Sequence, residues 1–289
     1  MACPSGALRI KAYDGKILDE APSGWKSTKM LFDMESFNLL DYTILVNSDQ
    51  CTNCDNCVDA CPAKALVMTH GKSRLEQERE HWDYFDTIPE MDRNKIDASK
   101  VSQQQLQEPL FKYPMGEDGC GQAPYLKLMS QLFGNRLLVA NATGASSIFG
   151  GALPTTPWCK TKEGRGPAWS NSLFEDNAEF GLGYRLSLDQ QELEAKKLLQ
   201  KLSGFIGDRL VRDILDARQT TEPEINQQRN RVDQLKTILK KVQMPEARVL
   251  SKSADSLVKK SVWIVGGDGW AYDIGYGGLD HVLASGKNV

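Results

Sequence analysis

The sequence has no long apolar segment and no surplus of either charge. None of its apolar runs approaches the roughly 18 residues that a membrane-spanning helix needs, and its N-terminus has no signal-peptide core. The 35 Lys and Arg residues are balanced by 38 Asp and Glu residues, so no basic excess is available to bind a nucleic-acid backbone. These absences predict a soluble, cytoplasmic protein that binds neither nucleic acid nor membrane.

Length and composition predict two globular domains. The chain has 289 residues, about twice the usual domain length, and its hydrophobic (40%) and charged (25%) fractions exclude extended disorder. Residues 1–75 contain five of the seven cysteines, and we expect them to form one domain. Residues 76–115 are polar and interrupted by prolines, which predicts a linker, with a short helix over residues 73–80 at its start.

Residues 116–289 have the pattern of an α/β domain with a helical insertion. Up to about residue 185, glycine and proline are frequent between short apolar runs such as Leu137–Ala140. Between about residues 188 and 260, apolar residues recur at helical spacing, and Pro223 and Pro245 stand where helices can begin. We therefore expect several amphipathic helices inserted in this domain.

A strand, a tight turn and a helix are predicted near the end of the chain. Ser261–Val265 is a short β-rich run, the turn Gly266–Gly269 follows, and a helix is expected over residues 274–284. A carboxylate between glycines at the end of a strand allows a diphosphate and its Mg²⁺ to approach the backbone. Capping of the next helix by Asp268 explains the spacing equally well, so the pattern alone leaves both interpretations open.

Four of the cysteines form a compact motif, Cys51-x-x-Cys54-x-x-Cys57-x-x-x-Cys61-Pro62. An odd total, with four cysteines within eleven residues, indicates metal ligation in a reducing compartment rather than a disulfide framework. The spacing is that of bacterial ferredoxins. Structural zinc sites usually separate two Cys-x-x-Cys pairs by a longer loop, so we favour an iron–sulfur cluster over zinc.

The start of the chain repeats the end of this motif. Residues 3–10 and residues 61–68 both read Cys-Pro-small-x-Ala-Leu-x-apolar. In two-cluster ferredoxins the last cysteine of a motif ligates the other cluster, so Cys61 is the single ligand present for a second site and the chain is expected to be truncated at its start. The predicted ligands of one complete [4Fe–4S] cluster are Cys3, Cys51, Cys54 and Cys57.

Three longer motifs resemble the pyruvate:ferredoxin (flavodoxin) oxidoreductase family. They are Ala-Asn-Ala-Thr-Gly-x-Ser-Ser (140–147), Gly-Arg-Gly-Pro-Ala-Trp-x-Asn-Ser-Leu-Phe-Glu-Asp-Asn-Ala-Glu (164–179) and Trp-Ile-x-Gly-Gly-Asp-Gly-Trp-Ala-Tyr-Asp-Ile (263–274). The segment around Cys159 is similar to the form found in nitrogen-fixing bacteria, and the resemblance covers essentially the whole chain.

The resemblance implies a fragment with two folds. A partial α+β ferredoxin-like [4Fe–4S] domain would precede an incomplete α/β thiamine-diphosphate-binding domain that contains the helical insertion. The family converts pyruvate and coenzyme A to acetyl-CoA and CO₂, and passes the electrons through [4Fe–4S] clusters to ferredoxin or flavodoxin. The resemblance also implies that the missing segments of the enzyme are partners of this chain, and that the complete enzyme is a homodimer.

Site residues also follow from the resemblance. Asp268 would ligate Mg²⁺, beside a diphosphate contacted by Gly267, Gly269 and Trp270. Gln122 stands where the family usually has a glutamate that contacts thiamine. Cys120 corresponds to a ligand of the cluster nearest the thiamine.

Two departures from the family pattern affect that proximal cluster. Glu117 and Ala145 stand at positions where the family has cysteine ligands, and the fourth ligand is expected beyond Val289. Cys159 is at no ligand position. The sequence therefore supports three hypotheses: part of the enzyme that is inactive alone, a non-catalytic [4Fe–4S] electron-transfer module, or a degenerate remnant.

Overall fold

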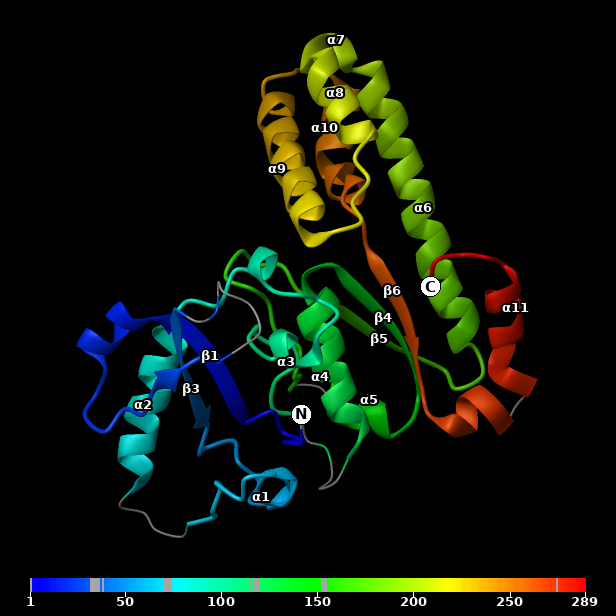
Figure 1. The fold of residues 1–289 in the computed structure, drawn as a ribbon. Helices are drawn as coiled ribbons and strands as arrows, with labels where there is room; N and C mark the ends of the chain where they lie inside the picture. The colour runs from blue at the N-terminus through cyan, green and yellow to red at the C-terminus, as the bar shows by residue number, and fades with distance from the viewer. Residues whose placement is uncertain are drawn as a thin grey trace. The chain divides into compact units, whose positions relative to one another are not determined.

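The computed structural model divides the chain into two compact units (Figure 1). Unit 1 comprises residues 1–135 and 145–167, and unit 2 comprises residues 136–144 and 168–289. The residues that the structure describes are 2–31, 37, 39–69, 74–114, 116, 120–151, 155–273 and 275–289. None of the helices in these ranges is both long enough and apolar enough to cross a membrane.

Unit 1 is built on a small antiparallel sheet in the order β1-β3-β2. β1 and β3 pair along their whole length, from Leu8 opposite Val46 to Asp14 opposite Leu40. Its strands are β1 (Leu8–Asp14), β2 (Thr28–Lys29) and β3 (Leu40–Val46). Its α-helices are α1 (Asn56–Ala60), α2 (Leu75–Thr87), α3 (Val101–Gln104), α4 (Gln122–Phe133) and α5 (Ala145–Gly151). Short 3₁₀ turns are η1 (Gly15–Glu20), η3 (Arg93–Lys95) and η4 (Gly134–Arg136).

The segment that we expected to be a linker is packed within unit 1. Helix α2 contacts β3, and its Phe85 is fully buried. Further along, Leu106 belongs to a core cluster with Ala12 of β1 and Met30, which directly follows β2. The apolar residues of this segment are too sparse to form a periodic pattern, but the tertiary fold buries them individually.

Both faces of β1 are covered, including one that carries two charges. Arg9 and Lys11 are about 5% and 3% exposed, and both lie within 3.2 Å of the Glu90 carboxylate. Lys11 Nζ also donates to the carbonyls of Phe85 (3.0 Å) and Ile88 (2.6 Å) at the end of α2. Positive charges are favoured at a helix C-terminus, so these contacts of Lys11 stabilise the packing of α2 on the sheet.

Unit 2 contains a parallel sheet in the order β5-β4-β6, which confirms a mixed α/β region after the ferredoxin-like part. Helix α6 packs on β4 and β6, and Gly181 permits the close approach: a Cβ there would lie 2.3 Å from Ile264 Cγ1. The strands are β4 (Leu137–Ala142), β5 (Ala168–Ser172) and β6 (Ser261–Val265).

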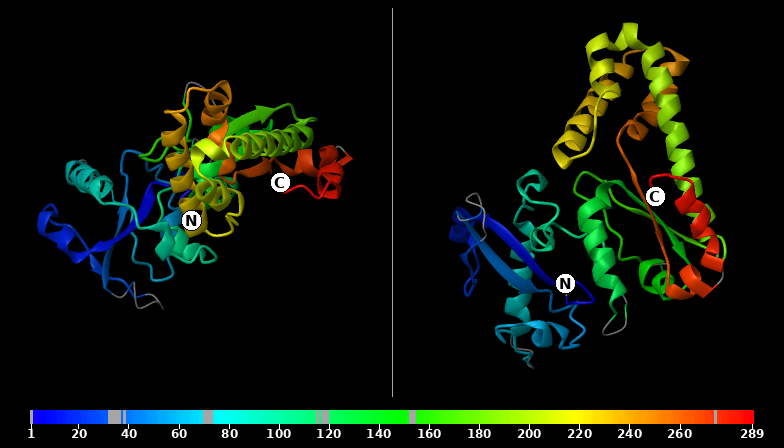
Figure 2. Two further views of the ribbon diagram at one scale, coloured as in Figure 1. Left: turned by 90° about the horizontal axis from the view of Figure 1, so that it is seen from above. Right: turned by 45° about the vertical axis from the view of Figure 1, so that its right-hand side comes forward.

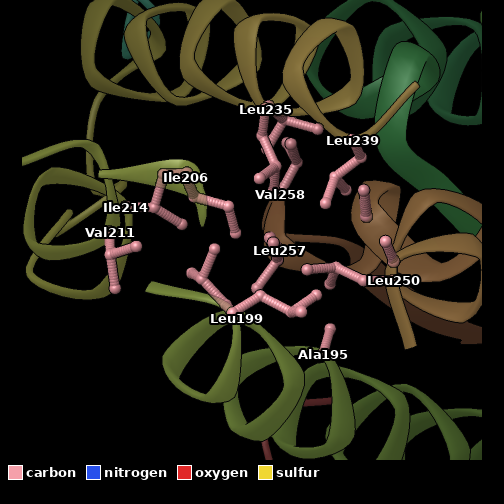
Figure 3. Close-up of a cluster of buried hydrophobic side chains, with 14 of the residues drawn as sticks. Ala195, Leu199, Ile206, Val211, Ile214, Leu235, Leu239, Leu250, Leu257 and Val258 are labelled. Atoms are coloured by element: carbon pink, nitrogen blue, oxygen red, sulfur yellow. The ribbon is translucent and has the colours of Figure 1, made fainter. Parts of the chain in front are cut away.

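The expected helical insertion is present as a layer of helices with its own core (Figures 2 and 3). The predicted prolines lie in the first turns of α9 and α10: Pro223 is the second residue of α9, and Pro245 is the first residue of α10. The core of this layer is formed by buried side chains that include Leu199, Ile214, Leu235, Leu250 and Leu257. Its elements are α6 (Asn177–Lys201), α7 (Ser203–Ile206), α8 (Asp208–Leu215), α9 (Glu222–Leu239), α10 (Pro245–Ser253) and η5 (Ala254–Leu257).

The helix predicted over residues 274–284 is shorter than expected. After β6 the chain forms a π-helical turn, η6 (Gly269–Asp273), a 3₁₀ turn, η7 (Gly275–Gly278), and then α11 (Leu279–Ala284). Tyr276, Gly277 and Gly278 all have positive φ angles, a left-handed conformation that an α-helix excludes. Position 274 lies outside the described residues.

Candidate iron–sulfur site

The loop that carries Cys51, Cys54 and Cys57 is tightly wound. Asn53 and Asp55 adopt left-handed conformations, with φ of 57° and 59°. Asn and Asp tolerate this conformation better than other residues with a side chain. Helix α1 begins directly after Asp55, and the loop turns its three cysteines toward one pocket.

Four thiols line this pocket, and they are the four predicted ligands of one cluster. The space is about 340 Å³, including part that is open to solvent. Ala7, Leu8, Val46 and Met68 provide apolar walls. The cysteines that line it are Cys3, Cys51, Cys54 and Cys57.

The four thiols line one common space. A cubane cluster places an iron atom at each sulfur, so it needs a space between the sulfurs, and this pocket provides one. The arrangement fits a [4Fe–4S] cluster.

Hydrogen bonds favour the thiolate form of Cys3. Burial raises the pKa of its thiol, but the Ser5 hydroxyl and the N–H groups of Leu8, Ala7 and Gly6 outweigh this and lower it. The Ser5 Oγ lies 3.5 Å from Cys3 Sγ. By contrast, burial raises the pKa of Cys57, and the neighbouring Cys3 and Cys51 thiolates raise it further. This repulsion is consistent with the three cysteines lining one pocket.

Cys61 has the same local geometry as Cys3 but lies outside the pocket. Gly6 and Lys64, each three residues after its cysteine, have φ angles of 69° and 48°. Their N–H groups donate to the carbonyls of Cys3 (3.2 Å) and Cys61 (3.1 Å), respectively. The sequence repeat is thus also a structural repeat of the turn that follows each cysteine.

The turn after β6 lies at the carboxyl edge of the parallel sheet, where ligands of open α/β sheets bind. Asp268 and Gly267 are exposed, and the Asp268 side chain caps no helix within the described residues. Trp270 is buried at 4% exposure, and its indole packs so closely under Gly266 that a Cβ there would lie 2.4 Å from Cε3. The Trp270 ring is therefore part of the core.

An asparagine network joins the carboxyl ends of these strands. Asn177, fully buried at the start of α6, accepts from Ser172 Oγ (2.8 Å) and donates to the carbonyl of Val265 (3.0 Å). Asn141 donates to Asn171 Oδ1 (3.0 Å). Sequence inspection identified these residues only as parts of motifs, because polar residues without periodicity give no burial signal.

The residues assigned to the proximal cluster are only partly described. Cys120 and Gln122 precede or begin α4, and both are partly exposed. Ala145 is an exposed residue at the start of α5 and offers no ligand atom. Glu117 lies outside the described residues.

Comparison with known families first defines the class of the N-terminal part. Residues 1–65 match a family model described as a 4Fe-4S dicluster domain, and residues 43–104 match a second model of the same description. The N-terminal part of the chain therefore matches ferredoxin-like domains of the class that holds two [4Fe–4S] clusters.

The whole chain matches a particular group of proteins. It is 53% identical over 297 residues to a putative pyruvate-flavodoxin oxidoreductase of Synechocystis sp., and 52% identical over 301 residues to the pyruvate-flavodoxin oxidoreductase of Trichormus variabilis. A probable enzyme of this name from Escherichia coli is 43% identical over 299 residues. These alignments cover all of this chain and 25%, 25% and 24% of the relatives. The chain is thus homologous to about a quarter of a pyruvate-flavodoxin oxidoreductase, as its motifs predicted.

Proposed function

We propose that the chain holds one [4Fe–4S] cluster through Cys3, Cys51, Cys54 and Cys57 and passes electrons within a pyruvate-flavodoxin oxidoreductase. The observation that supports this most strongly is the pocket lined by these four thiols. A bound cluster supplies one-electron transfer. The relatives' names associate the homologous region with pyruvate oxidation and a flavodoxin acceptor.

The protein's own residues would set the properties of this site. The Ser5 hydroxyl and the backbone N–H groups after Cys3 stabilise negative charge on its sulfur. Ala7, Leu8, Val46 and Met68 restrict the access of water. Hydrogen bonds to sulfur and solvent exposure both influence the reduction potential of such clusters.

For the second half we propose an incomplete thiamine-diphosphate-binding domain. Its support is the exposed Asp268 beside Gly267 at the carboxyl edge of a parallel sheet, where Asp268 would hold Mg²⁺ and Gly267 and Gly269 would lie beside a diphosphate. Trp270 would support this turn from the core, and Gln122 would contact thiamine. We retain residues 1–75, 76–115 and 116–289 as the proposed ferredoxin-like, connecting and thiamine-diphosphate segments.

In the complete enzyme, pyruvate and coenzyme A would be the substrates and ferredoxin or flavodoxin the acceptor. The remaining segments of the same enzyme would complete the thiamine site, within a cytoplasmic homodimer. Cys120 would be one ligand of the cluster nearest the thiamine, and Cys61 one ligand of a further cluster.

A non-catalytic electron-transfer module is the second candidate. It is favoured by Ala145, which cannot replace a cysteine ligand and would leave the proximal cluster short of a thiolate. The two candidates differ in whether pyruvate can reduce the chain once the missing segments of the enzyme are supplied.

Anaerobic reconstitution with iron and sulfide tests the proposal. We expect about four iron atoms per chain, a paramagnetic signal after dithionite reduction, and reoxidation by added flavodoxin. We also expect no pyruvate- and coenzyme A-dependent viologen reduction by this chain alone, because Ala145 offers no ligand atom to the cluster that would receive the electrons first. A cluster that flavodoxin cannot oxidise would contradict the electron-transfer role.

A further inference from the structure

Lys127 on α4 is a buried cation without a carboxylate partner in the part of the chain that the structure describes. It is 7% exposed, and its Nζ donates one hydrogen bond, 3.3 Å long, to Gln105 Oε1. Burying an ammonium group is costly unless an opposite charge compensates it. The position therefore needs an anion that the carboxylates do not supply.

The stem of Lys127 lies against the turn that carries Cys3. A Cβ on Gly6 would lie 3.7 Å from Cδ and 4.0 Å from Cε of Lys127. The Gly6 N–H closes this turn by donating to the Cys3 carbonyl. Helix α4 and the turn belong to the same unit, and the Lys127 stem packs beside the turn of a proposed cluster ligand.

The charges around Lys127 identify its counter-ion. Burial lowers the pKa of Lys127 to about 8, the nearby Arg9 guanidinium lowers it too, and the Cys3 thiolate raises it. Negative charge on the Cys3 sulfur therefore favours the ammonium form of Lys127. Lys127 is thus stabilised by the same sulfur that lines the pocket.

We propose that Lys127 is a positioning residue of the iron–sulfur site whose ammonium group compensates negative charge at Cys3 and makes the bound cluster easier to reduce. This inference rests on the cluster assignment proposed above. The reduced state carries one more negative charge than the oxidised state, so a fixed cation nearby stabilises it more. The role is electrostatic, and Lys127 transfers neither a proton nor an electron.

The alternative is a purely structural role, in which Lys127 only packs α4 against Gly6 and Gln105. Three variants separate the two. Lys127→Met keeps an unbranched apolar stem and removes the charge, whereas Lys127→Arg keeps the charge. Lys95→Met, at an exposed position of the same unit, is the matched control for loss of one charge.

The test is a potentiometric titration of the anaerobically reconstituted full chain, followed by electron paramagnetic resonance. We expect Lys127→Met to retain its iron. The reduction potential of its cluster should fall by at least 59 mV, which is a tenfold change in the equilibrium constant of a one-electron couple. Lys127→Arg and Lys95→Met should shift by less than half of this. An unchanged potential in iron-loaded Lys127→Met would overturn the inference.

Loss of iron is also informative. If Lys127→Met loses its iron, Lys127→Gln is judged by the same shift in potential. Loss from both neutral variants, with retention in Lys127→Arg, supports charge compensation, whereas loss from all three shows a packing role and refutes it. Failure of the unmodified chain to bind any cluster contradicts the proposed function instead.

Discussion

The cysteines differ in the hydrogen bonds that their sulfur atoms accept. The Ala65 N–H lies 3.4 Å from Cys61 Sγ, and this bond, with further N–H groups of the same turn, lowers the pKa of Cys61. Cys57 has the opposite shift, because burial and the charges of Cys3 and Cys51 raise its pKa. Identical residue types in one motif therefore have different acidities.

This difference predicts the order of alkylation in cluster-free protein. A lowered pKa gives more thiolate at a given pH, and the thiolate is the nucleophile. As the pH rises from neutral, iodoacetamide should therefore modify Cys61 before Cys57. Peptide mass spectrometry over a pH series measures both midpoints, and a lower midpoint for Cys57 would contradict the assigned environments.

The burial of Arg9 and Lys11 could not be predicted from the sequence. A strand with alternating charges normally exposes them, but here α2 covers that face and Glu90 pairs with both side chains. The grouping of Cys51, Cys54 and Cys57 around one pocket was predictable, because ferredoxin spacing encodes a local loop. Lys127 was not, since its relation to Cys3 depends on how α4 packs.

Among the elements, α6 connects the sheet to the helical layer. Its first half packs on β4 and β6 through Gly181, and its second half contributes Ala195 and Leu199 to the helical core. The sequence predicted the insertion from about residue 188, in the middle of this continuous helix. Helical periodicity cannot mark that boundary, because a helix continues unchanged while its packing partner changes.

Two glycines of α6 give a matched test of this packing. Gly181→Ala should destabilise the protein by about 1–3 kcal/mol, because its Cβ would lie 2.3 Å from Ile264 Cγ1. Gly183→Ala meets nothing within 4 Å and should stabilise it by about 0.5–1 kcal/mol through helix propensity. Urea unfolding followed by circular dichroism measures both, and equal effects would show that α6 does not approach the sheet at Gly181.

Near the end of the chain, a turn interrupts a helix that the sequence pattern predicted as continuous. The strand β6 was predictable from its β-branched run, but the left-handed residues Tyr276 to Gly278 divide the expected helix. Glycine permits that conformation without strain, whereas it is uncommon for tyrosine. Such a turn leaves no periodic signal in the sequence.

At the scale of the whole molecule, the chain divides into an iron–sulfur unit and a parallel-sheet unit. The relatives that it matches are about four times as long. The central claim concerns a contact between distant parts of the first unit: Cys3 at the N-terminus completes a pocket formed by the loop of Cys51, Cys54 and Cys57.

Comparing Cys3→Ala with Cys61→Ala tests this claim most directly. Both cysteines follow the same Cys-Pro pattern and the same turn geometry, but only Cys3 lines the pocket. After anaerobic reconstitution, we expect about four iron atoms per chain in Cys61→Ala and a loss of most of the iron in Cys3→Ala. Full iron in Cys3→Ala, together with its loss from Cys61→Ala, would show that the local motif alone binds the cluster and would contradict the account.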